Sequence, residues 1–198
     1  MKTRLVSMTF AALLLLWSAV SFAGEFEDGL AAYNREDYKT AVAMLTKAAN
    51  KGDAKAQTML GAMYSEGQGV PQDYKQAASW YRKAADQGNA KAQTNLGAMY
   101  ADGRSVTQDY KQAASWYRKA ADQGNAVAQN NLGEMYKDGQ GVTQDYVEAY
   151  KWFNLAARYA TDKALRDKAS TKRHIVALTM TTAQLAEAQK RAKEWKKK

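Results

Sequence analysis

The stretch that decides the fold is Ala54–Asn89, which reads AKAQTMLGAMYSEGQGVPQDYKQAASWYRKAADQGN. It recurs almost letter for letter as Ala90–Asn125, and once more after that with a larger number of differences. The aligned tyrosines Tyr74, Tyr110 and Tyr146 are each 36 residues apart. A fixed period of this length is typical of a solenoid, in which each unit buries its apolar face only against its neighbours.

The first half of each unit predicts a helix. Its apolar residues follow the spacing of one helix face: Ala56, Leu60, Met63 and Tyr64. Gly61 lies inside this helix and recurs as Gly97 and Gly133, which indicates that a neighbouring helix passes too close for a β-carbon. Gly67 lies where the helix should end, a position at which a left-handed glycine is common.

The second half of each unit predicts another helix, which begins after Asp73. Asp73 and Gln76 fit a capping box, as do Asp109 with Gln112 and Asp145 with Glu148. The expected buried stripe consists of Tyr74, Ala77, Tyr81 and Ala84. Gly88 should end this helix and Asn89 should cap the next one. Each unit is therefore expected to be a helical hairpin.

These residues carry a family resemblance. The Leu60-Gly61-x-x-Tyr64 core, followed by Ala77, Tyr81 and Ala84, resembles the tetratricopeptide pattern. The longer glycine-bearing loop and the Gly-Asn link between units resemble the Sel-1-like repeat family more closely. Gln57, Gln93 and Gln129 stand where tetratricopeptide repeats carry tryptophan, which also favours the Sel-1-like family. The resemblance implies an all-α fold, a right-handed α-solenoid of stacked helical hairpins closed by a C-terminal capping helix pair.

The N-terminus predicts a targeting segment. Met1–Ala23 has a charged start, an uncharged apolar stretch and small residues at Ser21 and Ala23, so we expect a signal peptide cleaved after Ala23. The alternative is an uncleaved membrane anchor, because the apolar run is almost long enough to span a bilayer. We expect a periplasmic or secreted protein, and with no cysteine it has no disulfide.

The chain is expected to divide into six segments. A signal peptide is followed by a degenerate N-terminal repeat that acts as a cap, three full repeats and a basic helical C-terminal cap. The corresponding ranges are 1–23, 24–53, 54–89, 90–125, 126–161 and 162–198. Thr181 and Gln184 predict a capping box before a last helix, whose apolar stripe should cover the third repeat near Trp152, Phe153 and Ala156.

The positive charge is local. Residues 24–162 hold 16 basic and 17 acidic residues, whereas residues 163–198 hold 11 basic and three acidic ones. A basic tail can meet anionic lipid, cell-wall polymer or nucleic acid. The aromatic residues that interleave with cations on nucleic-acid surfaces are missing here, and export removes most nucleic acid from reach. We therefore expect a solvated tail with at most weak membrane contact, and no nucleic-acid partner.

The sequence shows no catalytic constellation. The one histidine, His174, has no cysteine or acidic cluster at metal-ligand spacing, which predicts no metal site. Ser79 and Ser115 have no base at a fixed offset, and no phosphate-binding loop is present. The sequence predicts a protein that is not an enzyme and needs no cofactor.

What remains is a surface for binding. In tetratricopeptide-like stacks the first helices line the concave face, so we expect partner contacts at their outward positions. These are Lys55, Thr58, Met59 and Ala62, then Lys91, Thr94, Asn95 and Ala98, then Val127, Asn130, Asn131 and Glu134. Asn95 and Asn131 form the most suggestive pair, since amides one repeat apart could hold an extended peptide backbone.

The resulting hypothesis is an exported, monomeric, non-catalytic scaffold that binds a peptide or partner protein along this face. The alternative is a cell-envelope factor whose basic C-terminal segment docks on an anionic polymer or membrane, with the repeats as a spacer. The sequence does not identify the partner.

Overall fold

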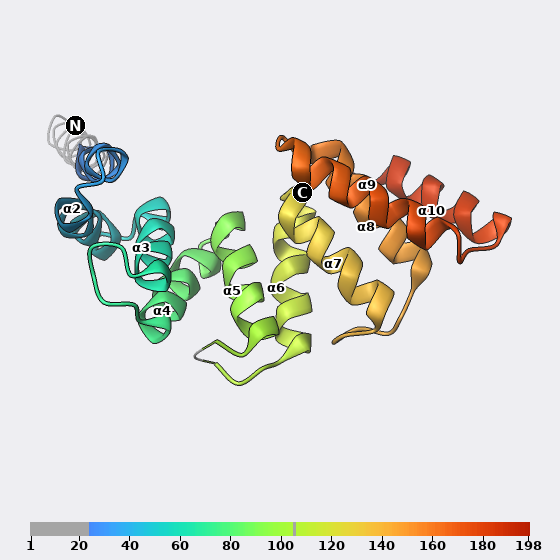
Figure 1. Ribbon diagram of the computed structural model, residues 1–198, viewed down its shortest axis with the longest axis horizontal. Coiled ribbons are helices and arrows are strands. Elements are labelled where there is room, and N and C mark those ends of the chain that lie inside the picture. Colours follow the sequence, from blue (N-terminus) through green and yellow to red (C-terminus); the bar gives the residue numbers. More distant parts are fainter. Residues whose placement is uncertain (1–23, 105) are drawn as a thin grey trace, which may run out of the picture. The chain divides into compact units, whose positions relative to one another are not determined.

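The computed structural model of the chain describes residues 24–104 and 106–198 (Figure 1). The predicted signal peptide lies outside this range. All regular structure within the described residues is helical. None of the helices in this part of the chain is both long and apolar enough to cross a membrane.

The described helices are short and follow one another closely. Residues 24–34 are helical. They are followed by α2 (Tyr38–Asn50), α3 (Ala54–Glu66), α4 (Tyr74–Asp86), α5 (Ala90–Asp102), α6 (Tyr110–Asp122), α7 (Ala126–Asp138), α8 (Tyr146–Tyr159), α9 (Lys163–Ala177) and α10 (Thr182–Glu194). The chain divides into two compact units, of which the first ends at Ala84 and the second runs from Ala85 to Lys198.

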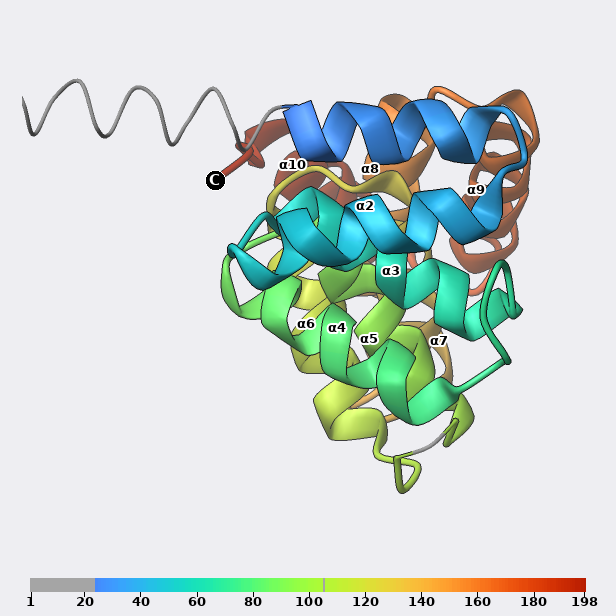
Figure 2. The same cartoon turned by 90° about the vertical axis from the view of Figure 1, so that its left-hand side faces the viewer.

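The first unit is built around α2 and α3. Helical residues 24–34 lie beside α2 (Figure 2), and the rings of Tyr33 and Tyr38 meet edge to face at 5.4 Å. The core of this unit consists of fully buried small and aliphatic side chains: Ala32, Ala41, Leu45, Ala48, Ala56, Leu60 and Met63. The predicted helices of the opening segment therefore pack as a helix pair against the first full repeat.

The second unit contains α5 to α10. Its largest cluster joins α6, α7 and α8 through residues that include Tyr117, Leu132, Met135, Trp152 and Leu155. A second cluster joins α8, α9 and α10 through Ala149, Tyr150, Phe153, Val176 and Ala188. Alanine supplies much of both clusters, because helices that pack closely leave room only for small side chains.

The predicted helix ends are confirmed. The side chains of Asp53, Asn89 and Asn125 cap α3, α5 and α7, each by accepting a hydrogen bond from the backbone N–H three residues further on. Gly67, at the end of α3, has a left-handed backbone with φ of 72°. The same geometry recurs one period later at Gly103, with φ of 68°.

In the predicted capping boxes of the second helices, only one of the two expected kinds of hydrogen bond forms. Asp109 accepts from the backbone N–H groups of Lys111 and Gln112, as the prediction requires. Its own backbone N–H, which Gln112 was expected to bind, donates instead to the carbonyl of Tyr100 at 3.0 Å. The same bond ties Asp145 to Tyr136. In both repeats this N–H group donates to a carbonyl of the first helix instead. The prediction of a reciprocal bond from the side chain three residues further on was therefore wrong. The box at Thr181 and Gln184 is complete.

The glycine inside each first helix is required by close packing, as predicted. A β-carbon on Gly61 would lie 2.6 Å from the ring of Tyr81 in the first unit. In the second unit, a β-carbon on Gly133 would lie 2.7 Å from the ring of Phe153. Real β-carbons do not approach atoms this closely, so any larger residue must push the second helix away.

Buried glutamines tie each first helix to the end of the preceding helix. The Nε2 group of Gln57 donates to the carbonyl of Ala49 at 3.0 Å, and Gln129 donates to Ala121 at 3.1 Å. Most buried polar groups in proteins are hydrogen-bonded, and these carbonyls belong to the last turn of a helix, where the helix itself supplies no N–H four residues further on. The amide thus replaces the tryptophan of a tetratricopeptide repeat with a polar contact.

The two last helices both pack on α8, as expected of a cap. On α10, Leu185 and Ala188 join the cluster around Phe153, and Trp195 packs against the cluster that contains Trp152. The Trp195 ring also meets Tyr159 edge to face at 5.4 Å. Beyond α10 the chain returns to the end of α6, where the Lys198 backbone donates to the carbonyl of Asp122. The predicted position of the C-terminal helix is confirmed.

Candidate functional site

The exposed face of α5 carries two of the predicted contact residues. Lys91 is exposed and Asn95 is half-buried. Ala98, one turn further along, is partly buried against the neighbouring core. Lys91 and Asn95 therefore present a charge and an amide, both able to donate hydrogen bonds to a partner.

Two of the predicted contact residues point into the protein instead. Thr58 and Thr94 are only 4% and 6% exposed. Their hydroxyls donate to the carbonyls of Ala54 and Ala90, one turn earlier in the same helix, at 2.6 and 2.7 Å. A threonine can bury its hydroxyl in this way because the helix itself supplies the acceptor. The prediction that these two side chains project outward was wrong.

On α7 the predicted contact residues meet α9. The Nζ group of Lys172 on α9 forms an ion pair with Glu134 and donates to Oδ1 of Asn130 at 3.3 Å. Asn130 is 4% exposed and was wrongly expected to face outward. Glu134 also pairs with Lys137. Burial favours the neutral form of Glu134, but the two lysines outweigh it and hold the pKa of this carboxyl below its usual range.

Asn131 also forms hydrogen bonds within the protein. It hydrogen-bonds the phenol of Tyr117, which lies on α6. Burial raises the pKa of Tyr117 to about 12, and the hydrogen bond to Asn131 opposes only part of that shift. Asn131 also accepts a hydrogen bond from Asn130 at 3.2 Å. Of the proposed amide pair, Asn95 faces outward, whereas Asn131 partly serves to fix the core.

In the first unit, α3 shows a similar division. Lys55 is exposed and its Nζ lies 5.9 Å from the centroid of the Phe26 ring. Met59 is partly buried against the core of that unit. Of the predicted contact residues on α3, Lys55 offers a charged group to solvent, and methionine stands at position 59 where α5 has Asn95.

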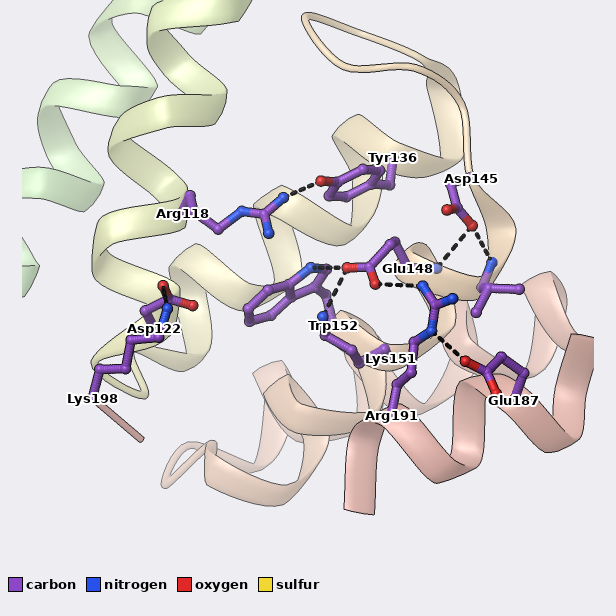
Figure 3. Close-up of polar contacts among 11 residues, drawn as sticks. Arg118, Asp122, Tyr136, Asp145, Glu148, Lys151, Trp152, Glu187, Arg191 and Lys198 are labelled. Atoms are coloured by element: carbon purple, nitrogen blue, oxygen red, sulfur yellow. Dashed lines mark hydrogen bonds and ion pairs between the residues drawn. The ribbon is translucent and has the colours of Figure 1, made fainter. Parts of the chain in front are cut away.

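A second polar cluster, which sequence reasoning missed, surrounds Glu148 on α8 (Figure 3). Oε2 of this carboxylate accepts from Nζ of Lys151 at 2.8 Å and from Nε1 of Trp152 at 3.1 Å. Oε1 accepts from Arg191 on α10 at 3.0 Å. Arg191 also bonds Glu187 on its own helix. Its position three residues after Asp145 indicates a capping box, and no spacing in the sequence indicates that Glu148 joins α8 to α10.

Arg118 completes this cluster from α6. Its guanidinium lies 5.3 Å from the centroid of the Tyr136 ring and 5.4 Å from that of the Trp152 ring, and it donates to the Tyr136 hydroxyl. Burial disfavours the charge of Glu148, but the cations Lys151, Arg191 and Arg118 outweigh it and lower the pKa of the carboxyl. The cluster therefore holds a charged carboxylate at neutral pH and joins four helices, α6, α7, α8 and α10, which is a structural role.

The described residues offer no metal centre. Among them, no group of three or more histidine, aspartate or glutamate side chains could hold a metal ion. His174 is exposed on α9, and Ser79 and Ser115 are exposed on α4 and α6.

Comparison with known families decides the assignment. The model of the Sel1 repeat matches four consecutive segments, residues 23–53, 54–89, 90–125 and 126–158. The chain belongs to the Sel1 repeat family. The first matched segment includes the opening helices described above, so this segment is itself a Sel1 repeat.

Solved structures agree with the Sel1 repeat assignment. A protective antigen of uropathogenic Escherichia coli, c5321, which displays this fold, is 40% identical over 79% of the chain with a TM-score of 0.72. A Sel1 repeat protein from Oxalobacter formigenes is 34% identical over 73% of the chain with a TM-score of 0.68. The chain covers 32% of the first protein and 56% of the second. No curated protein sequence matches.

Sel1 repeat proteins are generally protein-interaction scaffolds without catalytic function. In this member most buried positions of the first helices are the same in all three full repeats, including Ala92, Gln93, Leu96, Gly97 and Met99. The exception is the buried position occupied by Thr58, Thr94 and Asn130. The other positions that differ are at the surface or half-buried. They include Lys55, Lys91 and Val127, then Met59, Asn95 and Asn131, then Ala62, Ala98 and Glu134.

Proposed function

We propose that this Sel1 repeat protein is an exported, non-catalytic scaffold that binds a peptide or a partner protein through the surface of its first helices. One observation carries the proposal. Apart from the buried position of Thr58, Thr94 and Asn130, the first helices keep their buried residues constant and vary accessible ones, as expected when packing fixes the former and a partner selects the latter. Export rests on the predicted signal peptide and is part of the proposal.

The best-supported contact residues are Lys91 and Asn95 on α5. Both are accessible, and among the described residues neither makes a hydrogen bond or ion pair that would be lost when a partner binds. Asn95 can donate to and accept from a peptide backbone, while Lys91 can bind a carboxylate. Glu134 adds a carboxylate on α7, but Lys172 already pairs with it, so we assign it a smaller contribution.

The test begins with capture of a partner from an envelope extract by the mature chain, with identification by mass spectrometry. The purified partner is then titrated against two double variants. Lys91→Glu with Asn95→Ala should weaken binding by about tenfold or more, equivalent to ~1.4 kcal/mol. The matched control is Lys111→Glu with Gln112→Ala on α6, which likewise changes a lysine and a side-chain amide, here at exposed positions, and should leave affinity unchanged.

The alternative function is docking of residues 163–198 on an anionic polymer or membrane. The excess of 11 basic over three acidic residues favours it. Several of these cations are engaged within the protein, however. Lys163 pairs with Asp167, Lys172 with Glu134, Arg191 with Glu148 and Lys198 with Asp122. Binding driven by the tail should fall steeply between low and moderate salt, whereas binding through Asn95 should depend on salt only weakly.

A further inference from the structure

Helix α9 has a buried face and an exposed apolar face. Ala169 and Val176 are buried, and Val176 packs in the cluster formed with α8 and α10. On the other side, Ile175 is 53% exposed and Leu178, which caps the helix, is 74% exposed. Tyr159, another exposed large apolar residue, is accounted for by its contact with Trp195. Nothing within the described residues accounts for Ile175 and Leu178 in that way.

The exposed residues of α9 follow a regular stripe. Ala164, Lys168, Thr171, Ile175 and Leu178 are all exposed and are separated by four, three, four and three residues. This is the spacing at which one helix presents side chains to another in a coiled coil. The stripe is apolar at its C-terminal end and carries one cation, Lys168, towards its other end.

The charges around the stripe indicate the sign of the charge that a partner should carry. Lys168 forms no ion pair within the described residues, because its neighbour Asp167 is paired with Lys163 at 2.6 Å. His174, the residue before Ile175, is exposed as well. Residues 163–198 have 11 basic and three acidic side chains, so a second copy of this chain would bring like charge to the contact. An acidic partner would instead bring negative charge to this positively charged region.

We propose that the exposed stripe of α9 is a docking site for one amphipathic, acidic helix of a partner protein. Leucine or isoleucine side chains of that helix cover Ile175 and Leu178, and a carboxylate meets Lys168. A helix laid along α9 at coiled-coil spacing buries both apolar side chains, and the opposite charges fix its register. This site is separate from the α5 surface proposed above and does not depend on it.

The test uses a synthetic helical peptide of about three heptads, with leucine at positions a and d and glutamate at e and g. The glutamates also keep the peptide from pairing with itself. A second peptide has lysine in place of glutamate. Binding to the full mature chain is measured by fluorescence anisotropy. The glutamate peptide should bind and the lysine peptide should not.

Three variants locate the site. Ile175→Ser with Leu178→Ser should weaken binding of the glutamate peptide by about tenfold or more. Lys168→Glu should reduce binding of the glutamate peptide and permit binding of the lysine peptide, an exchange that nonspecific adhesion does not produce. Val127→Ser removes an apolar side chain that is 46% exposed on α7 and should change nothing. All three change exposed residues, so their melting temperatures should equal that of the parent.

Several outcomes would overturn the proposal. One is that the glutamate peptide fails to bind, or binds the serine double variant as tightly as the parent. Another is that vesicles containing phosphatidylglycerol retain the parent but not the double variant, which would make the stripe a membrane contact. A third is that the parent dimerises and the double variant does not. The Lys91→Glu and Asn95→Ala variant should bind the glutamate peptide normally, so failure here leaves the α5 proposal standing.

Discussion

A β-carbon placed on Gly97 would lie 2.8 Å from the ring of Tyr117, so the two helices of this repeat meet where only a glycine fits. Gly61 faces Tyr81 and Gly133 faces Phe153 in the same manner. The aromatic ring lies where a larger residue would place its side chain. The contact sets the distance between the first and second helix of every full repeat.

Gly97→Leu should therefore destabilise the protein. Overpacking costs roughly 1–3 kcal/mol or more, and the gain in helix propensity of about 1 kcal/mol offsets only part of it. Urea unfolding followed by circular dichroism should show a lower midpoint. Ser115→Leu, which adds the same side chain at an exposed position of α6, is the control. Equal midpoints for both variants would show that α5 and α6 do not pack as described.

The buried glutamines Gln93 and Gln129 should contribute differently to stability. Oε1 of Gln93 accepts a hydrogen bond from Gln123 at 2.9 Å, whereas Oε1 of Gln129 is buried with no partner among the described residues. The residue that corresponds to Gln123 one repeat later is Tyr159, which packs on Trp195 instead of donating. The third repeat has thus exchanged a polar contact for an aromatic contact with the C-terminal cap.

Gln93→Leu should consequently cost more stability than Gln129→Leu. Both variants lose one hydrogen bond to a backbone carbonyl, but the first also loses the hydrogen bond from Gln123. Because Gln123 keeps the carbonyl of Gly88 as an acceptor at 2.9 Å, we expect this extra loss to be roughly 0.5 kcal/mol. Chemical unfolding of the two variants against the parent measures the difference. A larger loss for Gln129→Leu would contradict the assignment of hydrogen bonds.

The sequence predicted what depends on neighbours within a repeat. Helix limits, the capping residue Asn89 and the role of Gly97 all follow from spacing within one period. Ion pairs and hydrogen bonds that come from outside the period were missed. Lys172 reaches Glu134 from α9, 38 residues further along the chain, and Arg191 reaches Glu148 from α10, 43 residues further along. No periodic pattern contains such pairs.

The candidate contact surface was predicted less well than the fold. An outward position on a helical wheel does not tell whether a side chain is covered by a later segment, as Asn130 is by α9. Thr94 was mispredicted for a different reason. Its hydroxyl donates to the carbonyl of Ala90 on the preceding turn, so the side chain can be buried without losing a hydrogen bond. Lys91 and Asn95 are accessible, and their polar groups make no hydrogen bond or ion pair within the part of the chain that the structure describes.

Docking of the cap should weaken in acid. The pKa of Glu148 is lowered by Lys151, Arg191 and Arg118 against the effect of burial, so its ionised form is favoured more in the folded than in the unfolded chain. Its contribution to stability is complete above the unfolded pKa of ~4.3 and is lost as the pH falls through the lower folded value. The free energy of unfolding should decline below about pH 5.

Glu148→Gln should flatten part of this acid decline, which equilibrium unfolding at several pH values measures. Glu194→Gln, an exposed glutamate on α10, is the control and should keep the parent's profile. An unchanged slope in Glu148→Gln would show that this carboxylate does not link α8 to α10.

Removal of the last helix should expose the third repeat. Deletion of residues 181–198 removes Leu185, Ala188 and Trp195 from their contacts with α8 and bares the apolar face around Phe153 and Trp152. We expect a lower melting temperature and association that increases with protein concentration, as seen by analytical ultracentrifugation. Changing Lys196 and Lys197 to serine is the control and should leave both properties unchanged. A truncated chain that stays monomeric with an unchanged melting temperature would mean that α10 is not a cap.

The central claim, that a partner protein binds the surface of the first helices, is tested most directly by site-specific photocrosslinking in the producing cell. A benzophenone amino acid replaces Asn95 on α5 or, as the control, Gln112 on α6. The account predicts one discrete adduct of the exported protein from position 95 and none from position 112, with the crosslinked protein identified by mass spectrometry. Adducts of equal yield from both positions, or from position 112 alone, would contradict it.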